Sequence, residues 1–203
     1  MTGGRLFVIA APSGAGKTSL VRELLAREPN LRVCVSHTTR KQRPNEVDGR
    51  DYHFVDAARY AALRDGGALL EHAEVYGRGY GTPRAPVEAA LAEGRSIVLD
   101  IDVKGAEQVR RAMPDAVGIF VLPPGVDAIR DRLEARRTDS AEVIARRVAE
   151  AHEQLARCGD YAYLVWNDVL ETAQAQLDAI VIAELSRATR RRRWVRTMSA
   201  GPA

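Results

Sequence analysis

The apolar positions of this chain form short β-prone runs, separated by longer segments with helical spacing. Between residues 17 and 29, for example, Leu20, Val21, Leu24 and Leu25 recur at helical intervals until a proline ends the pattern. The β-prone runs are residues 6–10, 32–36, 96–101, 117–122 and 163–166. Buried strands that alternate with helices are typical of an α/β fold, in which helices cover both faces of a parallel sheet. We therefore predict such a sheet as the core.

Residues 37–82 interrupt this alternation. They contain a polar loop, an alternating stretch at 50–55, a short helix from an Asp56 N-cap to Gly66, and a further strand near 69–75. We predict that this segment is an insertion with its own small mixed sheet.

Two further helical regions are expected outside the insertion. Pro83 at a first helical position, behind Thr82 as N-cap, predicts a helix that stops at Gly94. The charged stretch 130–147 predicts two helices joined by a mobile turn at 137–140.

Composition limits the class of protein. The 203 residues are 46% apolar and 28% charged, which fits one globular domain with at most an inserted subdomain. The formal net charge is +3, but six arginines follow Glu184, the last acidic residue. Subtracting these six from +3 leaves a net charge of −3 for residues 1–184. The basic excess therefore belongs to the C-terminal tail and gives little support to nucleic-acid binding by the body of the chain.

The two cysteines, Cys34 and Cys158, match no CxxC or metal-ligand spacing. We expect them to be reduced, buried thiols in a cytoplasmic protein. No apolar run approaches the roughly 18 residues of a membrane span, and the histidines form no HExxH array.

The first chemical motif is a glycine-rich loop. The sequence APSGAGKT follows the first predicted strand and opens the first predicted helix, as a phosphate-binding P-loop does. Lys17 would reach the β- and γ-phosphates of a bound nucleotide, and the Thr18 hydroxyl would face Mg²⁺. Ala11 stands where the strict GxxxxGK[ST] pattern has glycine, and a fortuitous glycine turn is the alternative. The predicted ATP-binding residues of this loop are Ala11, Pro12, Ser13, Gly14, Ala15, Gly16, Lys17 and Thr18.

A second motif, SHTTRKQR at residues 36–43, combines hydroxyls and cations at the end of a predicted strand. Arg40 and Arg43 can each bind a phosphate through two hydrogen bonds, and the hydroxyls of Ser36 and Tyr52 can complete its shell. A solvated basic turn is the alternative interpretation.

The run SHTTRKQRPNEVDGRDYHF, followed by Glu71, by GYGT at 79–82 and by LDIDVKG at 99–105, resembles the guanylate kinase family from about Gly4 to Glu184. The resemblance implies a P-loop nucleoside monophosphate kinase that uses ATP and Mg²⁺ to convert GMP to GDP in purine nucleotide metabolism. It also implies a core of residues 4–36, 83–125 and 150–184, a GMP-binding insertion at 37–82, a helical lid at about 126–149 and a basic tail at 185–203.

The resemblance also assigns roles to residues at matching positions. The GMP-phosphate ligands would be Ser36, Arg40, Arg43, Tyr52 and Tyr80, and the readers of the base would be Glu71, Thr82 and Asp102. Asp100 would lie near Mg²⁺ and its waters, and Asn167 near adenine. The catalytic cations would be Lys17, Arg43, Arg132, Arg136 and Arg147. Gly79 stands where relatives often have an aromatic residue, and Arg137 stands where many have glycine.

The choice of Glu71 and Thr82 also has a chemical basis. Guanine presents two adjacent donors, N1–H and the N2 amine, which a carboxylate accepts, and a carbonyl O6 that a hydroxyl can donate to. Adenine reverses this pattern and would leave the carboxylate unpaired, at a cost of roughly 1–3 kcal/mol or more. The alternative for Glu71 is a surface strand carboxylate paired with an arginine.

Three other functions compete with a GMP kinase. Guanylate-kinase-like modules of membrane scaffolds bind proteins without catalysis, a kinase of the same fold could act on a phosphorylated sugar, and the arginine tail could bind nucleic acid. We favour small-molecule partners, ATP and GMP, with no membrane and no nucleic acid. The sequence does not distinguish a monomer from a homo-oligomer.

Overall fold

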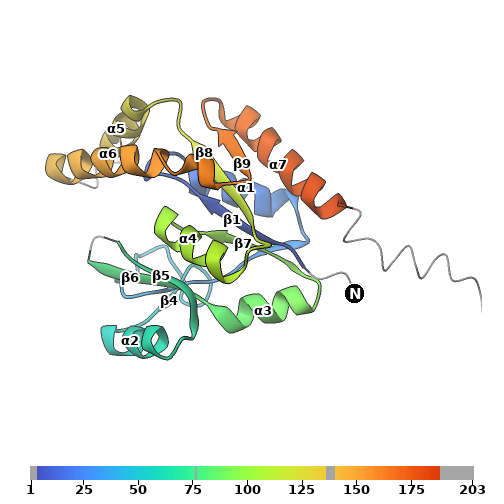
Figure 1. The fold of residues 1–203 in the computed structure, drawn as a ribbon. Coiled ribbons are helices and arrows are strands. Elements are labelled where there is room, and N and C mark those ends of the chain that lie inside the picture. The colour runs from blue at the N-terminus through green and yellow to red at the C-terminus, as the bar shows by residue number, and fades with distance from the viewer. Residues whose placement is uncertain (1–3, 76, 136–139, 188–203) are drawn as a thin grey trace, which may run out of the picture.

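The computed structural model describes residues 4–75, 77–135 and 140–187. Its main sheet contains five strands, all paired in parallel, in the order β2-β7-β1-β8-β9 (Figure 1). The strands are β1 (Leu6–Ala10), β2 (Leu31–Val33), β7 (Ser96–Asp100), β8 (Val117–Leu122) and β9 (Tyr163–Trp166). The predicted parallel sheet is therefore confirmed.

Helices cover both faces of this sheet. Alternate residues of β1 point to opposite sides, so that Phe7 and Ile9 join one apolar cluster and Leu6 and Val8 join the other. The first cluster includes side chains of α1 (Lys17–Arg27) and α7 (Leu170–Ser186), and the second includes side chains of α3 (Arg84–Ala92) and α4 (Val103–Ala112). A sheet buried on both faces explains why its strands are continuous apolar runs in the sequence.

The inserted segment forms a second sheet, as predicted. Its strands are β3 (His37–Thr38), β4 (His53–Phe54), β5 (Leu69–Val75) and β6 (Arg78–Pro83). Their order is β4-β3-β6-β5, with one parallel and two antiparallel pairs. Helix α2 (Ala57–Asp65) begins where Asp56 accepts a hydrogen bond from the Arg59 N–H (2.7 Å) and ends at Gly66.

The predicted N-cap of α3 is wrong. The cap is Pro83, which makes no side-chain cap bond, and Thr82 belongs to β6. Pairing between β5 and β6 continues to Leu69 and Pro83, and the buried Thr82 hydroxyl donates to Glu71 instead of to a helix N-terminus. The end of the helix is close to the prediction, since α3 stops at Ala92 and Gly94 follows with a positive φ of 82°.

Two helices follow β8, as the charged stretch predicts. They are α5 (Val126–Ala135) and α6 (Ala141–Leu155), and they share a small apolar cluster of their own that includes Ile129, Leu133 and Ile144. Most of the predicted turn between them, residues 137–139, lies outside the described residues. A short 3₁₀ turn, Cys158–Asp160, leads into β9.

None of the helices in the described ranges is long and apolar enough to cross a membrane. The arginine tail lies outside the described residues after Arg187.

Candidate functional site

The glycine-rich loop joins the carboxyl end of β1 to the first turn of α1. Gly14 (φ 87°) and Gly16 (φ 90°) adopt the left-handed conformation that favours glycine, and Gly16 is the N-cap of α1. The Ala11 side chain packs in the core cluster below the loop, so the missing first glycine is replaced by a buried methyl group. Backbone N–H groups at the start of a helix form an anion site, so this loop is built to hold phosphates.

Lys17 links the loop to the neighbouring strand. Its ammonium group donates to the Ile101 carbonyl (2.6 Å) and forms an ion pair with Asp100 at the end of β7. The structure therefore brings together the predicted phosphate cation and the predicted carboxylate of the metal site.

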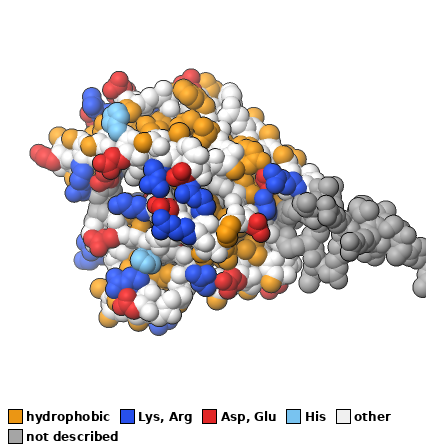
Figure 2. Space-filling view, viewed as in Figure 1, with side chains coloured by type: hydrophobic (Ala, Val, Ile, Leu, Met, Phe, Trp, Pro, Cys, Tyr) orange, Lys and Arg blue, Asp and Glu red, His pale blue; other side chains and the backbone are white. Residues whose placement is uncertain are grey.

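The loop opens into a cleft of about 660 Å³. The start of α4, the end of β5 and one face of α6 supply the other walls, including Asp102, Glu74 and Arg146. This volume lies within the range of small-molecule sites. Charged side chains gather on the face of the molecule shown in Figure 2, and Glu107 of α4 pairs with Arg111 and with Arg157, which lines the cleft.

Glu71 of β5 and Thr82 of β6 are paired in the small sheet, where β5 packs against α4. The Thr82 hydroxyl donates to Oε1 of Glu71 (2.6 Å) and lies 3.2 Å from the Ser36 hydroxyl. Glu71 is 3% exposed and Thr82 is fully buried. No cation among the described residues forms an ion pair with Glu71, so its interpretation as an arginine-paired surface carboxylate is wrong.

The protonation of Glu71 reflects this environment. The pKa of its carboxyl group is raised to about 7: burial is the largest cause, the negative charge of Asp102 adds to it, and the hydrogen bonds from Thr82 oppose it. Asp102 is the N-cap of α4 and accepts a hydrogen bond from the Gly105 N–H (2.7 Å). The two carboxylates thus come from β5 of the small sheet and from the start of α4, and both lie beside Gly105.

The basic cluster of the insertion is partly assembled. Arg40 forms a two-bond pair with Glu46 (3.0 and 2.7 Å), and its guanidinium lies over the ring of Tyr52. The rings of Tyr52 and Tyr80 are 5.9 Å apart. The side chain of Arg43 is exposed, whereas its N–H donates to Glu46 (2.9 Å).

Glu46 was missed by the sequence analysis. It is the only acidic residue between Ser36 and Val47, which is a signal that a phosphate-binding cluster carries an internal counter-ion. Burial and the negative charge of Asp100 raise the pKa of the Tyr52 phenol.

Asn167 and Arg132 both contact the phosphate loop. The amide of Asn167, which is 4% exposed, donates to the Ala15 carbonyl (2.6 Å). Arg132 donates to the same carbonyl (3.3 Å) and to that of Asn167 (3.2 Å). The first predicted lid arginine therefore reaches the loop from α5. Arg147 lies half-buried on α6, and Arg136 lies outside the described residues.

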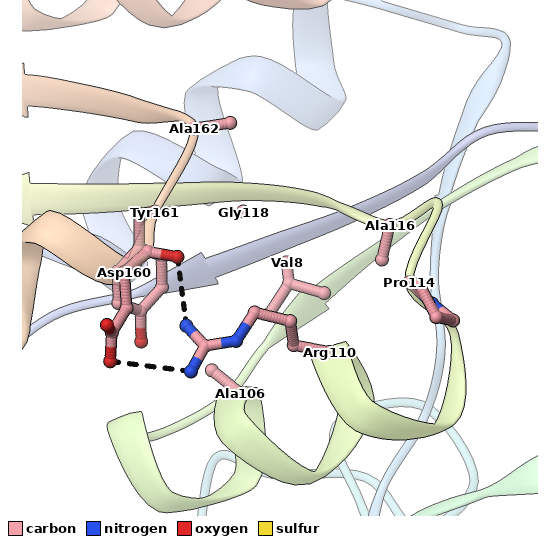
Figure 3. A pocket seen from close by; sticks show the side chains of 9 residues that line it. All are labelled: Val8, Ala106, Arg110, Pro114, Ala116, Gly118, Asp160, Tyr161 and Ala162. Carbon is pink, nitrogen blue, oxygen red and sulfur yellow. Dashed lines mark hydrogen bonds and ion pairs between the residues drawn. The ribbon is translucent and has the colours of Figure 1, made fainter.

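A second cavity, of about 340 Å³, lies on the other side of α4. Figure 3 shows Arg110 reaching across it to the Asp160 carbonyl (2.9 Å), beside Gly118 at the amino end of β8. It contains none of the predicted site residues. Ligands of open α/β sheets bind outside the carboxyl ends of the strands, where the first cleft lies.

Comparison with known proteins gives a consistent result. Residues 3–184 match the family model described as guanylate kinase. The chain is 51% identical over 178 residues to the guanylate kinase of Methylobacillus flagellatus, covering 88% of each chain, and 52% identical over 181 residues to that of Methylococcus capsulatus, covering 89% of each. Among solved structures, the crystal structure of guanylate kinase from Anaplasma phagocytophilum superposes with a TM-score of 0.77 at 31% identity, covering 94% of this chain and 90% of that one.

Proposed function

This chain belongs to the guanylate kinase family and is a phosphotransferase, and we propose that it transfers the γ-phosphoryl group of ATP to GMP, giving ADP and GDP. The observation that carries this proposal is the buried Glu71 and Thr82 pair, which lies in the small sheet against α4, the helix whose N-cap Asp102 lines the phosphate-loop cleft. The Glu71 carboxylate matches the two donors of guanine, and the Thr82 hydroxyl, which donates to Glu71 here, would turn to donate to the guanine carbonyl. A phosphorylated sugar would have no use for this pair.

ATP would bind with its phosphates on the loop from Ala11 to Thr18. Lys17 would exchange its contacts with Asp100 and Ile101 for oxygens of the β- and γ-phosphates, since these are the stronger anions. Asn167 supports the assignment of the loop as the ATP-phosphate site. Its amide donates to the Ala15 carbonyl and so stabilises the loop beneath the phosphates, in addition to the proposed contact with adenine.

GMP would bind with its phosphate in the insertion, residues 37–82. The proposed ligands are the hydroxyls of Ser36, Tyr52 and Tyr80 and the guanidinium groups of Arg40 and Arg43. Glu46 supports this role because it holds the Arg40 guanidinium beside Tyr52 before any phosphate arrives. Glu71, Thr82 and Asp102 would then read the base.

The helical lid would supply the remaining positive charge. We assign it to residues 126–149, with Arg132, Arg136 and Arg147 as its cations. Transfer requires a GMP phosphate oxygen to attack the γ-phosphorus in line as ADP leaves, so the protein contributes by positioning and by charge stabilisation. Closure over both substrates would also exclude water, which would otherwise accept the phosphoryl group.

The side chains near the loop fit a magnesium ion bound with ATP. The Thr18 hydroxyl and the Asp100 carboxylate are hard oxygen donors at the start of α1 and the end of β7. We expect such an ion to be held mainly by phosphate and water, because Mg²⁺ in nucleotide sites keeps several waters and few protein ligands. Bound there, Mg²⁺ would neutralise phosphate charge.

We also propose that the reaction takes place in the cytoplasm and recycles GMP for purine nucleotide metabolism. Both cysteines are free thiols, as expected in a reducing compartment, and burial raises the pKa of Cys34 to about 11.

A panel of nucleoside monophosphates tests the proposed function. With ATP and Mg²⁺ we expect ADP release with GMP, and far less with AMP, CMP or UMP. A protein that bound GMP without releasing ADP would be a binding module instead, and turnover with another monophosphate but not GMP would reject the assignment of the base site.

A further inference from the structure

Helix α4 contacts both sheets (Figure 1). Ala106 and Val109 pack into the core cluster below the main sheet, next to Val8 of β1. Gly105 and Gln108 instead meet β5 of the small sheet. Residues three apart on a helix lie on the same face, so α4 presents a glycine and an amide together to the strand that carries Glu71.

Gly105 leaves the space that the Glu71 carboxyl group occupies. A Cβ atom at Gly105 would overlap Oε2 of Glu71 and would lie 3.1 Å from its Cδ and 3.2 Å from Oδ1 of Asp102. The Gly105 N–H also donates to that same Asp102 oxygen (2.7 Å). One residue therefore touches both carboxylates of the proposed base site.

Gln108 holds the backbone beside Glu71. Its amide accepts a hydrogen bond from the His72 N–H (3.1 Å) and donates one to the His72 carbonyl (2.7 Å). Strand β5 is at the edge of its sheet, so the amide occupies the place that a neighbouring strand would take. Because His72 directly follows Glu71, these two bonds fix where the Glu71 side chain leaves the strand.

We propose that Gly105 and Gln108 are positioning residues that set the location of the Glu71 carboxylate and thereby determine selectivity for guanine. The proposal rests on GMP as the acceptor. Two parallel hydrogen bonds from N1–H and N2 require both carboxylate oxygens at bonding distance, and their strength falls steeply with distance and angle. A carboxylate displaced by a methyl group, or by a shift of β5, would lose that alignment while remaining buried.

Gly105→Ala tests whether the lack of a side chain at Gly105 sets the location of the Glu71 carboxyl group. We expect the KM for GMP to rise by about tenfold, equivalent to about 1.4 kcal/mol, and the preference for GMP over AMP to fall. The KM for ATP should stay within about twofold, because the phosphate loop is untouched. The melting temperature should be unchanged or higher, since alanine is a better helix former than glycine and the overlapping atom is the end of a side chain.

Gln108→Met tests the backbone contact by removing both hydrogen bonds at similar side-chain size. We expect the KM for GMP to rise by about three- to tenfold. Arg110→Met is the matched control, because Arg110 is on the same helix but its guanidinium donates to the Asp160 carbonyl (Figure 3). That variant should lose the hydrogen bond and ion pair that join α4 to Asp160, and it should keep the wild-type KM for GMP.

The proposal is overturned if both variants keep the wild-type KM and selectivity for GMP, or if Arg110→Met raises that KM as much as Gln108→Met does. A Gly105→Ala protein with a lower melting temperature and unchanged KM for GMP would also overturn it, because Gly105 would then be structural only. The wild-type nucleotide panel is measured first. Absence of GMP turnover in that panel would reject the proposed function before either variant is considered.

Discussion

Two buried glutamates in this protein have nearly the same exposure and opposite surroundings. Glu184, on α7, is 2% exposed and Glu71, on β5, is 3% exposed. Glu184 accepts hydrogen bonds from Arg5 (2.8 Å) and from the Tyr163 hydroxyl (2.7 Å), and it also pairs with Arg187 (3.1 Å). Glu71 has a threonine hydroxyl as its partner and a second carboxylate nearby.

The difference in partners distinguishes Glu184, whose contacts are structural, from Glu71, whose surroundings suit a bound ligand. Removing a carboxylate from water costs several kcal/mol unless partners replace the water. At Glu184 the chain supplies those partners, from the start of β1, from β9 and from the end of α7. At Glu71 it does not, and the donors of a ligand would complete the set. Burial of a glutamate therefore does not by itself indicate a binding site. In this protein the informative feature of Glu71 is that its buried carboxylate has no cationic partner within the part of the chain that the structure describes.

Removal of the Glu184 side chain should have the largest effect on folding. We expect Glu184→Ala to lower the free energy of unfolding by about 3 kcal/mol, because the half-buried Arg5 and Tyr163 would lose their shared partner. Urea denaturation measures this change. Kinetic constants measured well below the melting temperature should match the wild type, and a raised KM for GMP would erase the distinction between the two glutamates.

Glu71→Gln should impair activity without lowering stability, the opposite of the result expected for Glu184→Ala. We expect kcat/KM for GMP to fall about 100-fold, or about 2.7 kcal/mol, because an amide cannot accept from both guanine donors. Discrimination against AMP should weaken as well. At pH 8 the variant should unfold at the same or higher urea concentration than the wild type, since no charge is buried. If instead selectivity is unchanged and stability falls, Glu71 is structural like Glu184.

The pH dependence of stability should single out Glu71. Its pKa of about 7 in the folded protein lies above the ordinary value of 4.5, so between these two pH values the folded state holds a proton that the unfolded state has already released. Stability from this group is present below pH 4.5 and is lost as pH rises through about 7. The loss should reach about 3 kcal/mol by pH 8. Urea denaturation of wild type and Glu71→Gln from pH 5 to 8 isolates it, and parallel curves would contradict the assignment.

The smallest effects should come from a matched pair of hydroxyl deletions. Tyr163→Phe removes a donor to Glu184 and should cost about 1–2 kcal/mol of stability without changing activity. Thr82→Val removes the donor to Glu71 and should raise the KM for GMP several-fold. Equal effects of both variants on the KM for GMP would contradict the comparison.

Much of the fold and of the site could be predicted because it depends on local sequence. The alternation of strands and helices, the glycine loop and the Asp56 cap each need only neighbouring residues. Glu71 and Thr82 were found through a family resemblance together with the chemistry of guanine.

The remaining features depend on contacts between distant parts of the chain. Arg5 and Glu184 are 179 positions apart, and no local pattern pairs them. Thr82 is a good helix cap by type, but strand pairing and the hydrogen bond to Glu71 override that preference. The contact of Asn167 with the phosphate loop likewise joins residues 152 positions apart.

The glutamine amide on the edge of β5 also bears on how this protein avoids aggregation. An exposed edge strand offers free N–H and C=O groups to a strand of another chain. Gln108 occupies both groups of His72, and at β9, an edge of the main sheet, Gln176 accepts from the Trp166 N–H (3.2 Å). At these two edges, a glutamine side chain thus occupies main-chain groups that an intermolecular strand would need in order to pair, which is the step that begins fibril growth.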